Sequence, residues 1–440
     1  MAVLGIINSD PEITKIVEAA FAAVPDIDYD LKFLAEKEEI LRFLGYDMPE
    51  IVIINFSDPV TDIGKIMAHI TGDRWMLNFG IVGIYSGRDS EEKILEKYKA
   101  ANLLTLLDNF RLRSHLVKTI QIIEQSYQII FQREFTRDLL DGVSGSFTIE
   151  NDILAIPLYA GMGAMLLTQR SLIDTDKKMY LQLALGELII NAVEHGNCGI
   201  TYEEKTTVLE KGISVVELVA EKCKDPAIRG RKVEFLWDIG RYITTFVIRD
   251  EGPGFNVQAH LEKIARQDIL SLHGRGIRIA QMFSSELKYN EKGNEVTMVI
   301  KHDDAVEHEV PLGFSKEQIL TVKAGDILLR ENESGDCLYY IVSGRYSVFH
   351  NRKKVGSLSV QDIFMGEMAF LLNQRRSASI RADGPGKLVR LSRKALVNII
   401  REYPHYGIFL SKLLAKRLVR SNDQNAILLE KLKNLNRQDG

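Results

Sequence analysis

The chain has 440 residues, of which 45% are hydrophobic and 26% are charged, and its formal net charge is −4. These values are typical of globular proteins, and the length predicts about three domains. They exclude an overall basic surface of the kind that recruits nucleic acid, and no apolar run reaches the ~20 residues that a membrane-spanning helix needs.

The first residues, MAVLGIINSD, lack the basic segment and long apolar core of a secretion signal. Three cysteines, Cys198, Cys223 and Cys337, lie far apart in the sequence and predict neither a disulfide framework nor a zinc site. We therefore expect a cytoplasmic protein.

Residues 1–108 alternate short apolar strands with helices. AVLGII predicts a buried strand and PEITKIVEAAFAAV an amphipathic helix, while EIVIINF and FGIVGIYS predict two further strands. This alternation is typical of a parallel sheet, whose functional residues gather at the carboxyl ends of the strands. Those ends carry Asn8, Ser9, Asp10, Asn55 and Ser86.

This layout resembles the flavodoxin-like receiver domain of response regulators, with departures at its phosphorylation site. The resemblance implies an acidic pair for Mg²⁺ where Asn8 and Ser9 stand, so Asp10 is the only acid left there. It implies a phosphoacceptor aspartate where Asn55 stands, and no lysine ends the expected fifth strand, NLLTLL; Ser86 alone matches. We predict a pseudo-receiver kept for contacts rather than phosphoryl chemistry; the alternative is an unrelated small α/β domain.

Residues 109–142 predict a linker helix without proline or glycine until Gly142. Apolar residues spaced 4, 3, 4 and 3 form one stripe along it: Leu116, Ile120, Ile123, Tyr127 and Ile130. The stripe suits either a homodimer or a neighbouring helix of the same chain. The stretch SHLVKTI is similar to the phosphoacceptor helix of histidine kinases, with His115 as candidate, but the second helix of their hairpin is missing. The alternative is an exposed helical histidine.

The helix KKMYLQLALGELIINAVEHGN carries polar residues on an otherwise apolar pattern. Glu187, Asn191 and His195 stand at i, i+4 and i+8, hence on one face. Buried polar groups need hydrogen-bond partners. A local polar network and a metal and nucleotide site are both consistent with this spacing.

Two glycine-containing stretches follow this helix. KVEFLWDIGRYITTFVIRDEGPGF predicts a hairpin turning near Gly240, whose second strand leads from Asp250 into a loop with Gly252 and Gly254. LSLHGRGIRIAQMF opens a helix whose backbone amides suit phosphate, at Gly274, Arg275 and Gly276. A closing hairpin, SELKYNEKGNEVTMVIK, is expected to turn at Gly293-Asn294.

This ordered set resembles the ATP-binding fold, an α/β sandwich, of gyrase-type ATPases, histidine kinases and anti-sigma-factor serine kinases. The resemblance implies that Asn191 coordinates Mg²⁺ on the phosphates, Asp250 accepts from the adenine amino group and Glu187 is the general base. It also implies that the two glycine boxes surround the nucleotide: Gly252, Gly254, Gly274, Arg275 and Gly276.

The branch of this superfamily that the sequence resembles most is the anti-sigma-factor serine kinases, which phosphorylate a serine of a small antagonist protein. The similarity lies in a short lid between Phe255 and Gly274 and in the boxes NAVEHGN and GNEVTMVIK. Residues 198–231 exceed the compact family form and are expected to be helical. They form either a partner surface or a solvated flap.

From about residue 312 to 400, short β-branched and aromatic runs alternate with turns, which predicts a small β-barrel or roll. DIFMGEMAFLLNQRRSASIRA resembles the phosphate cassette of cyclic-nucleotide-binding domains. The resemblance implies that Glu367, after Gly366, accepts from the ribose 2′-hydroxyl and that the helix at Met368 offers amides to the cyclic phosphate. Arg376 would pair with that phosphate and Ser377 would supply a hydroxyl.

Two departures from the family's cassette, Met365 and Gln361, put the ligand's identity in question. Arg375 and Arg376 together are alternatively a surface charge cluster.

After Leu391 the sequence is helical to its end, and too few residues remain for a DNA-binding helix-turn-helix domain. These helices are interpreted as the lid and relay of the cyclic-nucleotide domain.

The sequence thus predicts a multidomain α/β and α+β chain: a flavodoxin-like receiver (1–108), a linker helix (109–142), an α/β sandwich ATP-binding domain (143–303) and a β-roll cyclic-nucleotide-binding domain with C-terminal helices (312–440). The predicted function is a bacterial serine/threonine protein kinase acting on an antagonist or sigma-factor-like protein, with ATP, Mg²⁺ and cAMP or cGMP as ligands. The alternatives are a non-catalytic protein that sequesters its partner when nucleotide is bound, and a histidine kinase using His115.

Overall fold

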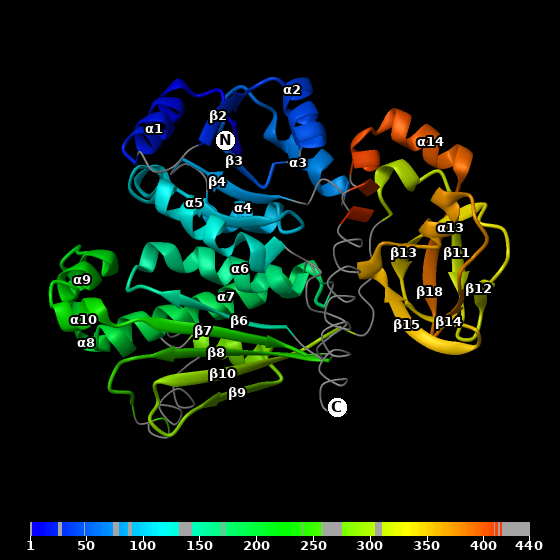
Figure 1. The fold of residues 1–440 in the computed structure, drawn as a ribbon. Coiled ribbons are helices and arrows are strands. Elements are labelled where there is room, and N and C mark those ends of the chain that lie inside the picture. The colour runs from blue at the N-terminus through cyan, green and yellow to red at the C-terminus, as the bar shows by residue number, and fades with distance from the viewer. Residues whose placement is uncertain are drawn as a thin grey trace, which may run out of the picture. The chain divides into compact units, whose positions relative to one another are not determined.

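The computed structural model (Figure 1) describes residues 2–24, 29–47, 49–73, 79–86, 90–131, 143–168, 170, 172–240, 242–255, 257, 275–303, 310–408, 410–411 and 414–415. The chain groups by contacts into two compact units. The first comprises residues 1–35, 51–63 and 79–303, and the second comprises residues 36–50, 64–78 and 304–440. The domain boundaries expected from the sequence stay predictions.

A parallel sheet forms the N-terminal part of the first unit. Its strands are β1 (Ala2–Ile7), β2 (Tyr29–Leu34), β3 (Ile51–Asn55), β4 (Gly80–Ile84) and β5 (Leu103–Leu107). Their order is β2-β1-β3-β4-β5, the order of flavodoxin-like doubly wound folds. Every residue of β3, β4 and β5 is buried, as expected for strands covered on both faces. Kinship with receiver domains stays a prediction.

The helices of residues 1–131 follow the strands along the chain. They are α1 (Pro11–Ala22), α2 (Lys37–Arg42), the π-helix η1 (Phe43–Asp47), α3 (Ile63–Gly72), α4 (Glu91–Lys97) and α5 (Asn109–Phe131). Helix α1 begins where the sequence places it because the Asp10 carboxylate accepts from the backbone N–H of Glu12 and Pro11 suits the first helical position.

Helix α5 buries the first part of its apolar stripe within its own chain. Leu116, Ile120 and Ile123 are at most 1% exposed, and α5 packs beside α1. The side chains of Tyr127 and Ile130 lie outside the described residues. The stripe therefore finds a neighbouring helix of the same chain, and a homodimer stays a prediction.

A second, antiparallel sheet belongs to the same unit. Its strands are β6 (Val143–Ile149), β7 (Val233–Ile239), β8 (Ile243–Asp250), β10 (Glu295–Lys301) and β9 (Glu286–Tyr289), paired in that order. The expected hairpins at Gly240 and at Gly293-Asn294 are both present. Burial alternates along β7, so one face of the sheet packs on helices and the other faces outward.

Helices accompany this sheet in three groups. The first are η3 (Ile153–Ala155), α6 (Ile156–Thr168), α7 (Thr175–Asn191) and the π-helix η4 (Ala192–Asn197). The insertion forms α8 (Tyr202–Glu210), α9 (Val215–Lys222) and α10 (Pro226–Gly230), and α12 (Arg275–Phe283) precedes β9. Figure 1 shows α6 and α7 between the two sheets, which explains why α6 is apolar on nearly all sides.

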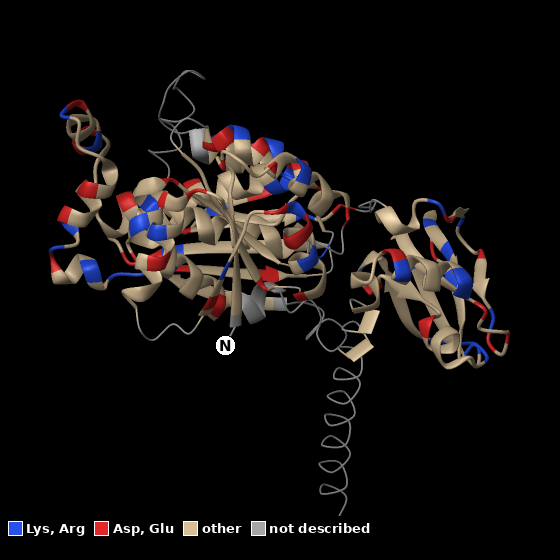
Figure 2. Ribbon diagram, turned by 90° about the horizontal axis from the view of Figure 1, so that it is seen from above, with Lys and Arg blue, Asp and Glu red and all other residues tan. Residues whose placement is uncertain are grey.

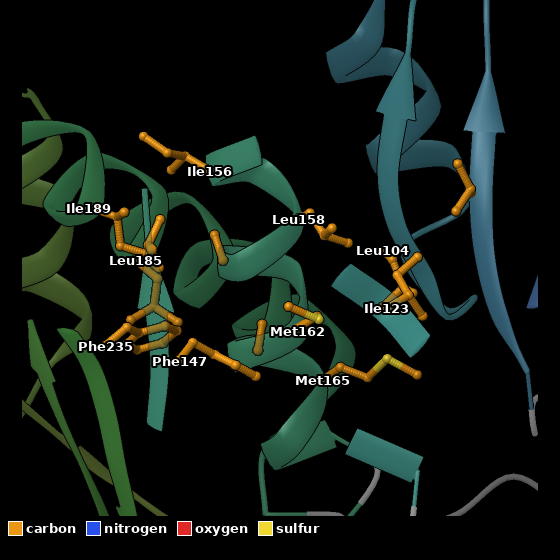
Figure 3. Packing of buried hydrophobic residues seen from close by; sticks show 14 of the residues in the cluster. Leu104, Ile123, Phe147, Ile156, Leu158, Met162, Met165, Leu185, Ile189 and Phe235 are labelled. Carbon is orange, nitrogen blue, oxygen red and sulfur yellow. The ribbon is translucent and has the colours of Figure 1, made fainter. Parts of the chain in front are cut away.

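One hydrophobic core joins the two sheets of the first unit. Figure 3 shows Leu104 from β5 close to Met162 and Leu158 of α6, with Phe147 and Phe235 beyond them. At Gly161 a Cβ atom would lie 2.3 Å from the carbonyl oxygen of Leu104. Helix α6 can approach β5 this closely because position 161 has no side chain.

The second unit contains a β-roll, which confirms the prediction from turn spacing. Its strands are β11 (Gln318–Val322), β12 (Ile327–Leu329), β13 (Cys337–Ser343), β14 (Arg345–His350), β15 (Lys353–Ser359), β16 (Phe364–Met365), β17 (Ser379–Ala382) and β18 (Gly386–Ser392). They form two four-stranded sheets, β11-β18-β13-β16 and β12-β17-β14-β15.

Short helices complete this roll: η5 (Leu312–Phe314), η6 (Val360–Asp362), α13 (Glu367–Leu372) and α14 (Arg393–Glu402). Aromatic residues dominate the core between the first sheet and α14, among them Phe314, Tyr340, Phe364 and Tyr406. Most of the C-terminal segment expected to act as a lid and relay lies outside the described residues.

The distribution of charged and apolar residues over the structure agrees with the mixed composition of the sequence. Figure 2 shows acidic and basic residues interspersed along the helices. In the described part of the chain, every helix is too short or too polar to cross a bilayer.

Candidate functional site

The predicted nucleotide site is built around the C-terminal end of α7. Asp174 caps the start of this helix, which runs without interruption through Glu187 and Asn191. These two residues are one turn apart, and Asn191 is half-buried. Although the side chain of Glu187 is exposed, partial desolvation raises the pKa of its carboxyl group; Lys205 opposes this rise and Glu194 adds to it.

The α-helical hydrogen-bond pattern of α7 ends at Asn191. Residues Ala192–Asn197 form a π-helix, a rare feature that is frequent at functional sites. Because the 3.6-residue register ends there, the predicted shared face does not extend to His195. The ring of His195 instead holds the following loop, with Nδ1 2.6 Å from the carbonyl oxygen of Ile200 and the Tyr202 ring at 4.6 Å.

Strand β8 delivers Asp250 to the inside of the molecule. Its side chain is 8% exposed, and its Oδ1 accepts from the backbone N–H of Gly252 at 2.8 Å. Burial raises the pKa of Asp250 to about 6, although the hydrogen bond from Gly252 and the charge of Lys292 oppose the rise. A carboxylate held in an unfavourable environment is typical of a binding site.

Glycines allow close approach of the backbone on both sides of Asp250. A Cβ atom at Gly196 would lie 2.3 Å from its carboxyl carbon, and one at Gly252 would lie 2.1 Å from the carbonyl oxygen of Gly196. Gly254, with a φ of +81°, approaches the β9–β10 turn, where its Cβ would lie 1.9 Å from the carbonyl oxygen of Lys292. The structure therefore brings the loop after β8 against η4 and the closing hairpin.

Two asparagines to which the sequence analysis gave no part in the nucleotide site hold this loop. The Oδ1 atom of Asn197 accepts from the backbone N–H of Glu251 at 2.9 Å, and its Nδ2 donates to Asn151 at 2.8 Å. The Nδ2 atom of Asn294 donates to the carbonyl oxygen of Asp250 at 2.7 Å. Both stand within the boxes quoted above, but only the fold shows which backbone groups they meet.

The second glycine box is only partly visible. Gly274 and nearly all of the lid before it lie outside the described residues, as does the side chain of Arg275. The backbone of Arg275 and Gly276 opens α12, as predicted. Helix α12 packs beside α7, and its last residue, Phe283, contacts Tyr180 near the beginning of α7, with ring centroids 6.4 Å apart. The start of α12 therefore points toward the end of α7 that carries Asn191.

The insertion at 198–231 is helical, as expected; α9 anchors it to the core, whereas α8 and α10 bury none of their residues. Leu218 and Val219 are buried in the common core. The Nζ atom of Lys205 lies 2.5 Å from the buried carboxylate of Glu194 in η4, and Arg231 donates to the carbonyl oxygen of Asn197 at 2.6 Å. The insertion is thus attached to the same segment that packs against Asp250.

The polar end of the parallel sheet is a closed hydrogen-bond network. The Nδ2 atom of Asn55 donates to Oδ1 of Asn8 at 2.8 Å, and the hydroxyl of Ser9 donates to Asp58 at 2.7 Å. Asp10 is the only acid directly after β1, and the fold brings a second acid, Asp58 from the segment after β3, to the same end of the sheet. Burial would raise the pKa of Asp58, but hydrogen bonds from Thr61, Ser9 and Val60 outweigh it and lower the pKa.

Ser86 takes part in this end of the sheet through its backbone, which donates to the hydroxyl of Ser57 at 3.0 Å. The absence of phosphoryl chemistry stays a prediction.

His115 is only partly exposed, and both of its ring nitrogens lie near polar side chains; its role as a phosphoacceptor stays a prediction. Its Nδ1 lies 2.7 Å from the hydroxyl of Ser114, and its Nε2 lies 3.5 Å from the carboxylate of Asp152. Both ring nitrogens have partners, and the side chain is 21% exposed. The expectation of an exposed helical histidine is therefore wrong.

In the second unit, Arg376 lies inside the roll. It is 3% exposed, and its guanidinium donates to the carbonyl oxygens of Gly366 at 2.7 Å and Cys337 at 2.5 Å. Its Nε is buried without a hydrogen-bond partner among the described residues. Arg375 is exposed, so the surface-cluster alternative holds for Arg375 and is wrong for Arg376.

The predicted cassette surrounds this arginine. Gly366 has a φ of +79° and caps α13, and a Cβ atom there would lie 2.6 Å from Nη1 of Arg376. Glu367 is buried, whereas Met368 and Ser377 are exposed. Met365 does not disturb the cassette, because it is fully buried in β16 and pairs with Tyr339 of β13. The side chain of Gln361 lies outside the described residues.

Two protein-family models match the chain in these regions. Residues 160–300 match the histidine kinase-like ATPase domain, and residues 319–403 match the cyclic nucleotide-binding domain. The chain therefore carries both domains, in the order expected from the sequence.

Relatives match the cyclic-nucleotide region. The chain is 34% identical over 119 residues to the mouse potassium/sodium hyperpolarization-activated cyclic nucleotide-gated channel 2, and 33% identical over 124 residues to the human channel 1. These matches cover 27% and 28% of this chain, and the chain spans only 14% of the length of each channel. Among solved structures, the Thermus thermophilus catabolite activator protein is 29% identical, covering 27% of this chain and 57% of that one, with a TM-score of 0.25.

Proposed function

We propose that this chain is a signalling protein in which a cyclic nucleotide controls an ATP-dependent serine/threonine protein kinase. Two nucleotide-binding domains of different kinds on one chain support the link between a sensor and an output. The observation that carries the proposal is Asp250, a buried carboxylate with a raised pKa, enclosed by glycine backbone at the centre of the ATPase domain.

Asp250 and its loop would recognise the base of ATP. A buried carboxylate lacks the hydrogen bonds that water would donate to it. It would gain a hydrogen bond by accepting from the adenine amino group. Gly252 and Gly254 let this loop pack against η4 and the β9–β10 turn, because side chains at these positions would collide with neighbouring backbone. Asn197 and Asn294 would position this loop rather than touch the nucleotide.

Asn191 and Glu187 would act on the phosphate side of the site. Asn191 would hold Mg²⁺, an ion that is often bound by few protein ligands together with substrate phosphates. ATP supplies the phosphoryl group, and Glu187, whose pKa is raised, would accept the proton of a serine or threonine hydroxyl.

The effector site would be the cassette around Arg376. The unpartnered Nε of this buried arginine fits an anion such as the phosphate of cAMP or cGMP. Gly366 is required there because a side chain would displace the guanidinium, and Glu367 would accept from the ribose. Ser377 would add a hydroxyl and α13 its backbone amides, beginning at Met368.

The partner would be an antagonist or sigma-factor-like protein of a bacterial signalling system, with a serine or threonine as phosphoacceptor. This part rests on the similarity of the sequence boxes to anti-sigma-factor kinases. A homodimer, a cytoplasmic location and the identity of the antagonist belong to the same proposal.

Replacing Glu187 by Gln tests the kinase assignment. We expect phosphoryl transfer from radiolabelled ATP to a candidate antagonist, and slow hydrolysis of ATP without partner, to fall by roughly 10²–10⁴-fold. The affinity for ATP should change little, because the substitution preserves size and leaves Asp250 intact. Glu203→Gln, on the exposed face of α8, is the matched control and should retain full activity.

Two results would contradict this assignment. Unchanged transfer by the Glu187→Gln variant would remove Glu187 from the mechanism. A wild-type protein that binds ATP and partner but transfers no phosphate would favour the non-catalytic, partner-sequestering alternative.

A further inference from the structure

A cavity of about 190 Å³ lies in the first unit, away from Asp250 and its loop. Its walls come from α4 and the start of β5 on one side and from α6 and α7 on the other. Leu103, Ile156, Ala160 and Ile190 are among the apolar residues that line it. Glu187, the proposed general base, stands at its exposed rim.

A buried ammonium group also lines this cavity. Lys178 is only 7% exposed, and its Nζ donates to the carbonyl oxygen of Ala101 at 2.7 Å. An ammonium group has three N–H donors, so two of them lack a protein acceptor within the described residues. Among the same residues no carboxylate forms an ion pair with Lys178.

The buried ammonium group of Lys178 lowers the stability of the folded protein unless a further hydrogen-bond acceptor or an anion contacts it. A buried charge without compensation destabilises the folded protein. Accordingly, burial lowers the pKa of Lys178 to about 8. A lysine on the outer surface of α7 would escape this cost, yet position 178 faces the cavity.

We propose that this cavity is a ligand site for a small monocarboxylate with an apolar body of about the size of a benzene ring. The carboxylate would bind Lys178, and the apolar walls would enclose the rest of the molecule. A cavity of roughly 150 Å³ is known to admit benzene, so the volume here leaves room for one additional polar group.

Charge and polarity select this class of ligand. A phosphate carries close to two negative charges, whereas one ammonium faces the interior of the cavity. Glu91 and Glu187 also line the cavity and would repel a second negative charge. A cation would meet the ammonium of Lys178, and a sugar would leave hydroxyl groups unpaired against the apolar wall.

The rim offers a route of entry. Leu183, Glu187 and Lys99 line the cavity and are exposed, whereas Lys178 and Ala160 line it and are buried. A ligand can therefore enter past α7, with its carboxylate directed toward the buried ammonium group of Lys178. Once bound, it would touch both the strand β5 side and the helix that carries Glu187 and Asn191, so it would be placed to influence the ATP site.

Direct binding of benzoate to the full chain, without any nucleotide, tests the proposal. We expect wild-type protein to bind benzoate with a Kd in roughly the micromolar to low-millimolar range by titration calorimetry or ligand-observed NMR. Benzyl alcohol, of similar shape but neutral, should bind at least about tenfold more weakly.

Three variants locate the site. Lys178→Met should weaken benzoate binding at least about tenfold and still fold, because it replaces a buried charge by an apolar chain of similar length. Lys99→Met is the matched control, since Lys99 lines the same cavity but is paired with Asp176, and it should bind as wild type within about twofold. Gly186→Leu should fill the cavity and abolish binding, because a Cβ at Gly186 meets only Ala160, at 3.8 Å.

The remaining outcomes overturn the proposal. Equal affinity for benzoate and benzyl alcohol would show that Lys178 does not select the anion, and unchanged binding by Lys178→Met or Gly186→Leu would place the ligand elsewhere. No binding at about 20 mM benzoate would leave the cavity without a ligand of this class. Because the experiment uses neither ATP nor a cyclic nucleotide, its result is independent of the proposed kinase activity.

Discussion

Two aspartates, one partly buried and one buried, show how the surroundings of a single residue separate structure from function. Asp58 accepts hydrogen bonds from Ser9, Val60 and Thr61, and these lower its pKa despite burial. Asp250 accepts one from Gly252, and burial raises its pKa to about 6. The first carboxylate stabilises the fold when ionised, whereas the second is destabilised until a ligand donates to it.

The first prediction concerns Asp250→Asn. A carboxyl group whose pKa is raised by folding stabilises the protein when protonated, and this contribution is lost as pH rises through about 6. Unliganded wild-type protein should therefore lose stability between about pH 4 and pH 7, and the variant should not. At pH 7 the variant should be more stable by on the order of 2 kcal/mol while its ATP affinity falls at least about tenfold. Denaturant unfolding and nucleotide titration measure the two effects.

Asp58→Asn is the matched control and should behave in the opposite way. Because folding lowers the pKa of Asp58, its contribution is present at neutral pH and is lost as pH falls through the folded-state pKa. The variant should be destabilised by about 1–2 kcal/mol at pH 7 and bind ATP normally. If the two variants changed stability and ATP affinity in the same way, the proposed role of Asp250 in binding ATP would be refuted.

The second prediction concerns Gly366→Ala. The left-handed backbone and the 2.6 Å approach of Nη1 of Arg376 both oppose a side chain there. We expect cyclic-nucleotide affinity to fall at least about tenfold, measured by titration with cAMP and cGMP. Gly356→Ala, in β15 where an added Cβ meets nothing within 4 Å, should leave affinity unchanged. Normal binding by the Gly366→Ala variant would exclude this cassette as the ligand site.

At the scale of elements, two glycines in neighbouring helices differ in whether a side chain would fit at their positions. Gly161 in α6 lets the helix contact the backbone of β5, whereas Gly186 in α7 has an open neighbourhood. Sequence patterns treat both as helix-weakening residues of the same kind. The element packed against each one decides its role.

The third prediction compares alanine at these two positions. Gly161→Ala should destabilise the protein by about 1–3 kcal/mol, because α6 must move away from the carbonyl oxygen of Leu104. Gly186→Ala should stabilise it by up to about 1 kcal/mol through helix propensity. Denaturant midpoints at constant slope measure both. Equal shifts in the same direction would contradict the packing argument.

At the scale of the whole molecule, the proposed control of ATP chemistry by a cyclic nucleotide is a statement about coupling free energy. A ligand shifts an equilibrium only by its difference in affinity for the two states. The fourth prediction is therefore reciprocal: the cyclic nucleotide changes the Kd for ATP by roughly 5–150-fold, and ATP changes the Kd for the cyclic nucleotide by the same factor.

Calorimetric titration of each ligand with and without the other measures this coupling. Arg376→Gln is the control, since it should abolish the effect of the cyclic nucleotide and leave the Kd for ATP alone unchanged. Affinities that do not respond to the second ligand would mean that the two domains act independently.

The sequence by itself determined the order of elements, the two nucleotide-binding regions and the residue types expected at each. This was possible because strand and helix periodicity and glycine turns are local properties, as at β1, α1 and the Gly293-Asn294 hairpin. It did not identify β2, an edge strand with mixed burial, or the π-helix that ends the register after Asn191.

Only the tertiary structure decided which side chains meet. Asp58 reaches Ser9 from 49 positions away, Asn197 reaches Glu251 from 54, and Lys178 is buried against Ala101 from 77. Sequence spacing carries no information on such contacts, because they depend on how sheets and helices pack. For the same reason the sequence left open whether Arg376 is a ligand-binding group or a surface charge, and only the structure shows that it is buried.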